Sequence, residues 1–173
     1  SDGTVIDSSY IYEQVRTITG SKSNDTLYGH DDQENILRGL EGDDRIYGRV
    51  GNDLLYGDSG NDILEGGNGN DTLIGGQGSD TLRGGYGDDL YIFNKGDGVD
   101  YIEDYEGNDT IQFGEGITLK DLKFFRYDSS GKSLRIAVGD NGDAISIANY
   151  FNDGSYSRPT DTFKVEKFLL SDG

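Results

Sequence analysis

A nine-residue repeat constrains this chain more than any other feature. The pattern Gly-x-x-Gly-x-Asp-x-apolar returns every nine residues from Gly39 to Ile92, which gives six consecutive units. Glycine permits the positive φ angles of a tight turn, and the apolar eighth position suits a short strand with one inward face. We therefore expect each unit to form a six-residue turn and a three-residue strand, with two units in each 18-residue coil.

Stacked coils of this kind predict an all-β fold, a right-handed parallel β-roll, which is a type of β-solenoid. The end coils of such a stack expose unpaired backbone groups, so terminal segments must cover them. We expect an N-terminal capping strand in residues 1–19, the roll in residues 20–112 and a β-rich cap in residues 113–173. Alternating patterns predict strands at Tyr10–Ile18, Ile117–Tyr127, Leu134–Val138, Ala144–Tyr150 and Phe163–Leu170.

Imperfect units flank the six regular ones. Upstream, Asp25 and Glu34 occupy the acidic sixth position, and one extra residue at Arg38 shifts the register. Downstream, Asp100 and Asp109 occupy that position after a two-residue insertion.

Turns on one edge of the roll recur every 18 residues, so sixth-position acids of alternate units should face one another. The regular pairs are Asp44/Asp62, Asp53/Asp71, Asp62/Asp80 and Asp71/Asp89. The flanking pairs, separated by 19 or 20 residues, are Asp25/Asp44, Glu34/Asp53, Asp80/Asp100 and Asp89/Asp109.

Paired carboxylates among flexible turn carbonyls suit Ca²⁺, which takes 6 to 8 oxygen ligands. Mg²⁺ demands stricter octahedral geometry, and Zn²⁺ prefers His or Cys, whereas His30 is the only imidazole and Cys is absent. We expect about four to eight calcium ions. Four would change the net charge of −18 to −10, and eight would change it to −2.

Composition indicates that calcium binding and folding are coupled. Hydrophobic residues make up only 32% of the chain, 28 residues are glycine, and no disulfide can form. The acidic charge excludes nucleic acid as a partner, and the chain has no apolar run long enough for direct membrane insertion. We expect a monomer, and the lack of any Met leads us to expect a segment of a longer protein.

The repeat units resemble the glycine-rich nonapeptides of the repeats-in-toxin (RTX) family, whose pattern is Gly-Gly-x-Gly-x-Asp-x-apolar-x. The stretches IQFGEGITLKDLKFF, AISIANYF and VEKFLLSDG are similar to the segment that follows the repeats in that family. The resemblance implies a β-roll, export by the type I secretion machinery, and folding on contact with calcium in an extracellular or bacterial cell-surface location.

The resemblance also implies how each ion is bound. One turn provides the carbonyls of its second and fourth positions and its Asp, and the facing turn provides the carbonyls of its first and third positions and its own Asp. For the Asp53/Asp71 pair the carbonyls would come from Arg49, Gly51, Gly66 and Asn68. Across the regular units the implied carbonyl ligands are Leu40, Gly42, Arg49, Gly51, Gly57, Asp58, Ser59, Gly60, Gly66, Gly67, Asn68, Gly69, Gly75, Gln77, Gly84 and Tyr86. Departures from the pattern lie at Glu34, Lys95 and Asp104.

Three other functions compete with that of a calcium-dependent secretion and folding module. Catalysis is not expected, because the protease-like GDSG at Gly57–Gly60 falls in register inside a repeat and His30 is the only candidate imidazole base. Ice binding needs a regular Thr or Asn row, which the third positions do not provide. An RTX adhesin with a cell-surface or glycan-binding role is the alternative to a secretion and folding module.

Overall fold

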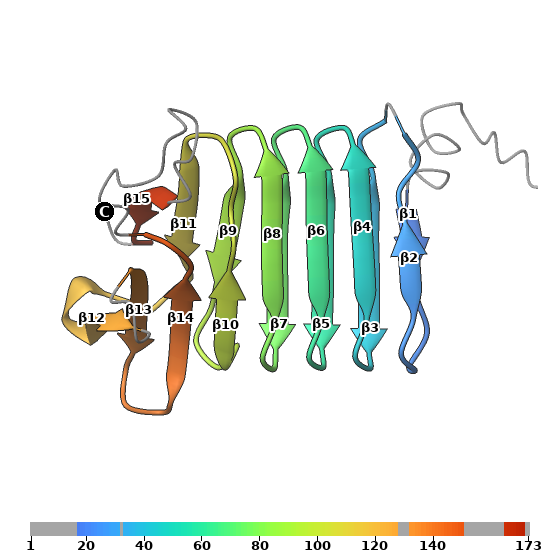
Figure 1. Ribbon diagram of the computed structural model, residues 1–173. Coiled ribbons are helices and arrows are strands. Elements are labelled where there is room, and N and C mark those ends of the chain that lie inside the picture. Colours follow the sequence, from blue (N-terminus) through green and yellow to red (C-terminus); the bar gives the residue numbers. More distant parts are fainter. Residues whose placement is uncertain (1–16, 32, 128–131, 151–164, 172–173) are drawn as a thin grey trace, which may run out of the picture.

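The computed structural model describes residues 17–31, 33–127, 132–150 and 165–171. Strands account for nearly all the regular structure (Figure 1). In chain order they are β1 (Thr17–Thr19), β2 (Thr26–Tyr28), β3 (Ile36–Glu41), β4 (Arg45–Val50), β5 (Leu54–Ser59), β6 (Ile63–Asn68), β7 (Thr72–Gln77), β8 (Thr81–Tyr86), β9 (Leu90–Phe93), β10 (Val99–Ile102), β11 (Asp109–Phe113), the 3-10 helix η1 (Leu119–Asp121), β12 (Leu122–Tyr127), β13 (Ser133–Val138), β14 (Asp143–Ile147) and β15 (Val165–Leu169).

Alternate strands enter two sheets that lie face to face (Figure 1). One sheet has the order β1-β3-β5-β7-β9-β11-β15, and the other has the order β12-β13-β14-β10-β8-β6-β4-β2. Neighbouring repeat strands are parallel, as in the pairs β3/β5 and β4/β6. The expected parallel β-roll is therefore confirmed, and the turns between its strands line up along two edges.

The strands are longer than the three residues expected from the repeat. β4 runs for six residues, from the seventh position of one unit to the third position of the next. Ladder pairing continues into those first positions, with Arg49 opposite Gly67 and Val50 opposite Asn68. Since each turn hydrogen-bonds to the turn stacked on it, the first half of each turn becomes an extension of the strand.

The upstream register shift lies at a different place from the one predicted. Residues 18 apart pair between β3 and β5, whereas residues 19 apart pair both between β1 and β3 and between β2 and β4. The extra residue must therefore lie in the connection between β2 and β3. Its expected position at Arg38 is wrong, because Arg38 is inside β3 and pairs in regular register with Tyr56.

Each regular repeat contributes one large buried side chain to the core of the roll. The eighth position of each repeat is fully or almost fully buried, and the residues are Ile46, Leu55, Leu64, Leu73, Leu82 and Tyr91. The next inward position is the first-position glycine, which adds no side chain to the core. Each buried Leu contributes about 1.5 to 3 kcal/mol, so a stack this thin depends on its edges as well as its core.

The C-terminal strands close the described end of the roll. β14 pairs parallel with β10, and β15 pairs parallel with β11, so both sheets continue beyond the repeats. β12, β13 and β14 form an antiparallel meander, and the DNGD sequence at Asp140–Asp143 makes the turn between the last two. The predicted strand at Ile117–Tyr127 is shorter than expected, because η1 precedes β12.

At the other end, most of the predicted strand Tyr10–Ile18 lies outside the described residues. Its described part enters β1, which pairs with β3 as the first strand of the roll. Within the described residues, no helix has the length and apolar character needed to cross a membrane.

Candidate metal centre

The sixth-position aspartates form two hydrogen-bonded ladders, one along each edge of the roll. On one edge, the N–H of Asp53 donates to Oδ1 of Asp71, and the N–H of Asp71 donates to Oδ1 of Asp89, each at 2.7 Å. On the other edge, Asp44 donates to Asp62 at 2.7 Å, and Asp62 donates to Asp80 at 2.8 Å. All four regular facing pairs predicted from the 18-residue spacing are therefore next to each other in the structure.

The second carboxylate oxygen of these residues is buried without a hydrogen bond. Within the described part of the chain, Oδ2 accepts no hydrogen bond in Asp44, Asp62, Asp71, Asp80 and Asp89. These residues are no more than 2% exposed. A buried carboxylate oxygen without a donor is costly, so its usual partner is a cation.

Turn carbonyls converge on the same oxygens. A Cβ added to Gly48 would lie 2.6 Å from both Oδ2 of Asp53 and the carbonyl oxygen of Gly66. At Gly57, an added Cβ would contact Asp62 Oδ2 and the Gly75 carbonyl in the same way. The first-position glycines of the first four regular units thus leave room for an aspartate oxygen and a carbonyl of the next coil to approach one another; they are Gly39, Gly48, Gly57 and Gly66.

The other implied carbonyls lie in the same turns. Second and fourth positions have left-handed φ angles, which are 82° at Arg49 and 135° at Gly51. Third-position carbonyls each accept one hydrogen bond from the preceding coil, as in the 3.0 Å bond from Gly51 N–H to the Asn68 carbonyl. A carbonyl oxygen has two lone pairs, so one remains for an ion. The structure gathers these carbonyls into the turns beside the aspartate ladders.

The electrostatics of the ladders agree with a cation partner. Burial raises the pKa of Asp62 to about 6, of Asp71 and Asp80 to about 7, and of Asp89 to about 8. Hydrogen bonds from backbone N–H groups oppose this effect, and facing carboxylates add to it. An adjacent divalent cation would favour the ionised form and reverse the shift.

At the upstream end, the residue that faces Asp53 is Asn35, and the expected Glu34/Asp53 pair is wrong. The Asn35 N–H and Nδ2 both donate to Asp53 Oδ1, at 2.7 and 2.8 Å. Asn35 is buried, whereas Glu34 is exposed. The extra residue between β2 and β3 moves Glu34 out of the sixth position. Asp25 does face Asp44, and its N–H donates to Asp44 Oδ1 at 2.7 Å.

At the downstream end, the ladders continue through both imperfect units. The N–H of Asp80 donates to Asp100 Oδ1 at 3.1 Å, and the N–H of Asp89 donates to Asp109 Oδ1 at 2.9 Å. The Asp109 N–H in turn donates to Glu166 Oε2 at 2.9 Å. Glu166 therefore extends one ladder into the C-terminal segment, and its separation of 57 residues from Asp109 hid it from the repeat pattern.

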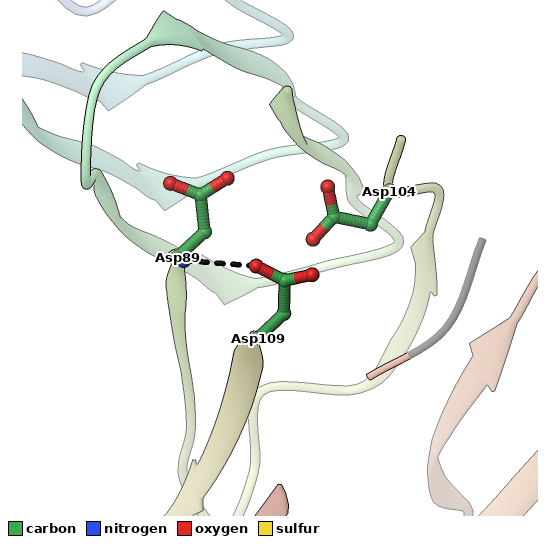
Figure 2. A group of neighbouring side chains, drawn as sticks. All are labelled: Asp89, Asp104 and Asp109. Atoms are coloured by element: carbon green, nitrogen blue, oxygen red, sulfur yellow. Dashed lines mark hydrogen bonds between the residues drawn. The ribbon is translucent and has the colours of Figure 1, made fainter. Parts of the chain in front are cut away.

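A third carboxylate joins the last pair on that edge. Oxygen atoms of Asp89, Asp104 and Asp109 all lie within 4.8 Å of one another, and all three residues are buried (Figure 2). Asp104 appears in the sequence only as a departure from the repeat. The sign of its role in the sequence was that Asp104 stands at a first position, where the regular repeats have glycine.

A second set of side chains links the turns outside the aspartate ladders. Asn52 Oδ1 accepts the N–H of Asn70 at 2.8 Å, and Asn70 Oδ1 accepts the N–H of Asp88 at 3.0 Å. On the other edge, Asp43 Oδ1 accepts the N–H of Asn61 at 2.8 Å. The repeat pattern leaves the fifth position unspecified, so these contacts were not predicted from the sequence. The restriction of that position to Asp43, Asn52, Asn61, Asn70, Ser79 and Asp88 was the available signal.

The residues present fit calcium better than other metals. The ladders offer only oxygen atoms, several of them anionic and buried, in turns whose glycines allow close approach. The protease-like sequence Gly57–Gly60 follows the same turn pattern, with the Ser59 carbonyl accepting the Gly42 N–H at 3.0 Å.

Comparison with known protein families agrees with this geometry. The RTX calcium-binding nonapeptide repeat matches in four copies, at residues 17–34, 31–64, 65–99 and 96–117. The haemolysin-type calcium binding protein related domain matches residues 134–173. A search of curated proteins found no match. RTX repeats form structural calcium-binding rolls and are not a known enzyme family. Since the four copies span more than half of the chain, this protein belongs to the RTX calcium-binding nonapeptide repeat family and is a calcium-binding module.

Proposed function

We propose that this chain is a calcium-dependent folding and secretion module of a larger exported protein, with ions bound between facing turns of the roll. The observation that carries the proposal is the row of buried aspartate Oδ2 atoms that accept no hydrogen bond from the described residues. Turn carbonyls approach these atoms closely, so an ion placed there would meet oxygen ligands from two coils.

The proposed side-chain ligands follow the ladders. In the regular units they are Asp44, Asp53, Asp62, Asp71, Asp80 and Asp89, and in the flanking units they are Asp25, Asp100 and Asp109. Asn35 replaces Glu34 at the upstream end, where its Oδ1 accepts the His30 N–H and its Nδ2 donates to Asp53, so Asp53 is the one carboxylate of that pair. The backbone ligands are the carbonyls of the second and fourth positions of one turn and the first and third positions of the facing turn.

Calcium then acts as a switch for folding. Without a cation, stacked ionised carboxylates repel one another, and a core of one side chain per strand cannot offset the ordering of many glycines. Extracellular modules bind calcium at about 10⁻⁴ to 10⁻³ M, so the cytosol would keep the chain unfolded for export through a type I channel. The folded product is an extracellular or cell-surface monomer in which the C-terminal strands β12 to β15 cap one end of the roll.

Isothermal titration calorimetry tests whether the turns bind calcium. We expect about four to eight calcium ions per chain, with a heat signal that includes folding, and a much weaker response to magnesium because of its stricter geometry. A chain that shows no calcium binding at millimolar concentration would refute the proposal.

Export is tested separately by fusing a passenger enzyme upstream of the chain in a host with a type I secretion channel. We expect passenger activity in the medium, and less of it when calcium is allowed to fold the fusion before export. Equal export of a passenger that lacks the chain would contradict the secretion role.

One observation favours a glycan-binding role as a second candidate. An open groove runs along the face of the roll near β8 and is lined by Arg83, Tyr86, Glu103 and Tyr105 among other residues. Tyr86 and Tyr105 are 59% and 43% exposed, and such amphipathic rings with nearby charges suit a sugar ring. A glycan array probed with the calcium-loaded chain, with Tyr86→Ala as the control, would detect this activity.

A further inference from the structure

Asp104 occupies a position that glycine occupies in the six regular repeats. The isolated bridge between Tyr86 and Glu106 and the pairing of Leu90 with Thr110 place Asp104 opposite Gly84. A Cβ on Gly84 would collide with Asp89 Oδ2 and with the Tyr91 hydroxyl. A side chain is tolerated at Asp104 because the array ends there: the strand that pairs with β11 on the far side is β15, not another repeat strand.

The Asp104 side chain is fixed inside the turn. Oδ1 accepts the N–H of Tyr105 at 2.7 Å and that of Gly85 at 3.3 Å. Oδ2 accepts the hydroxyl of Tyr91 at 2.8 Å, and the same hydroxyl oxygen accepts the Gly84 N–H at 2.7 Å. Asp104 is 2% exposed and Tyr91 is 1% exposed, so this carboxylate is held toward the interior of the edge and away from solvent.

Three buried carboxylates meet at this point without a basic partner. Figure 2 shows Asp89, Asp104 and Asp109 turned toward a common space. Among the described ion pairs, none involves any of the three. Asp89 Oδ2 is buried and accepts no hydrogen bond from the described residues, which is an independent sign that a ligand belongs here. Three ionised carboxylates in so small a volume repel one another, and a bound cation would offset that repulsion.

We propose that the last turn pair is a specialised calcium site in which the Asp104 carboxylate is an additional ligand, making it the tightest site of the array. Each regular pair has two aspartates, whereas this one has three. Calcium affinity rises with the number of charged ligands and with the rigidity of the site, and the Tyr91 hydroxyl provides the rigidity. The inference rests on the proposed function, since it assumes that the turns bind calcium.

Order of binding follows from this asymmetry. The site lies where the roll meets the C-terminal segment, and Asp109 is hydrogen-bonded to Glu166 of that segment at 2.9 Å. An ion bound here would fix the last coil against the cap, and the remaining coils would then stack on an ordered end. The repeats would fill from the C-terminal side toward Asp25.

Calcium titration of the full chain and of two variants tests this proposal. Asp104→Asn removes the charge, and Asp104→Gly restores the residue of the regular repeats. We expect both variants to lose the tightest binding step, with its Kd raised at least about tenfold, and the later steps that depend on the ordered end to move to higher calcium. The matched control is Asp88→Asn, which removes the same charge from an exposed fifth-position residue and retains the oxygen that accepts the Asn108 N–H.

The outcomes separate the two proposals. Variants at Asp104 that titrate like Asp88→Asn would overturn the specialised site and leave the other sites in place. Failure of the parent chain to bind calcium would instead overturn the proposed function. Circular dichroism at saturating calcium reports folding, and an Asp104→Gly chain that stays unfolded there would also count against the proposal, because it would assign Asp104 a structural role.

Discussion

The backbone N–H of Asp53 donates a 2.7 Å hydrogen bond to Oδ1 of Asp71, which lies 18 residues later. In this arrangement the two oxygens of one carboxylate have different roles. One oxygen joins consecutive coils, and the second oxygen approaches the carbonyls of the turn. The same arrangement recurs at Asp44 and Asp62, so the regular coils share one way of stacking and of presenting oxygen atoms to an ion.

Asp71→Ala should weaken two neighbouring calcium sites, because Asp71 faces both Asp53 and Asp89. Loss of a direct ligand should cost more than the roughly tenfold lost with an outer-shell partner. Calorimetry would show fewer ions bound and a higher calcium midpoint. Asp43→Asn is the control, since Asp43 is exposed and keeps an acceptor for the Asn61 N–H. Equal stoichiometry and midpoint in Asp71→Ala and the parent would refute the pairing scheme.

Asn35→Ala should destabilise the calcium-loaded roll by about 1 to 3 kcal/mol, since it leaves buried partners unsatisfied. Asn35 Nδ2 donates to the Gln33 carbonyl at 2.8 Å as well as to Asp53. Glu34→Ala, on an exposed side chain, should change stability by less than about 0.5 kcal/mol. Thermal unfolding in saturating calcium measures both. A larger effect at Glu34 than at Asn35 would restore the register that the sequence suggested.

Gly48→Ala should raise the calcium midpoint, because the new Cβ would lie 2.6 Å from both Asp53 Oδ2 and the Gly66 carbonyl. Crowding of this kind costs about 1 to 3 kcal/mol. Gly116→Ala is the control, with a φ of 79° and no atom within 4 Å of its added Cβ. That variant should lose about 1 to 2 kcal/mol of stability through its backbone angle alone and keep the parent's calcium midpoint. An unchanged midpoint in Gly48→Ala would place the ion elsewhere.

Acid should favour the roll in the absence of calcium, where the chain is otherwise unfolded at neutral pH. In the roll without calcium, burial raises the pKa of Asp71 to about 7 and of Asp89 to about 8, above the unfolded value of about 4. These carboxyls stabilise the calcium-free roll fully below the unfolded value, and that contribution is lost as pH rises through 7 to 8. In chelator the chain should therefore gain β-structure as the pH is lowered toward about 4, without any calcium.

Circular dichroism of the chain in chelator at a series of pH values measures this gain. The β-signal should be absent at pH 9 and should increase as the pH falls toward about 4. A spectrum that is the same at both pH values would contradict the burial of these carboxylates.

The sequence was sufficient for the architecture and for the regular pairs, because one spacing determines both. Asp44 to Asp89 face one another as an 18-residue coil requires, and their eighth-position neighbours are buried. The positions of local irregularities could not be predicted from this spacing. Placing the extra residue at Arg38 put Glu34 at the sixth position, where the structure has Asn35. The repeat pattern accommodated either residue there, and the strand pairing fixed the register.

Contacts across long separations were equally hidden. Glu166 reaches Asp109 only because β15 pairs with β11, and no periodicity links the two segments. Asp104 breaks the glycine rule where the array of repeats ends, and Lys95 breaks it on the other edge. Departures from the repeat therefore marked the end of the roll, where we propose a different kind of site.

Circular dichroism during a calcium titration, with magnesium as the control, tests the central claim most directly. At neutral pH in chelator we predict a spectrum without β-structure, and millimolar calcium should produce the full β-spectrum while magnesium at the same concentration does not. A chain that already shows the complete β-spectrum in chelator would contradict the account.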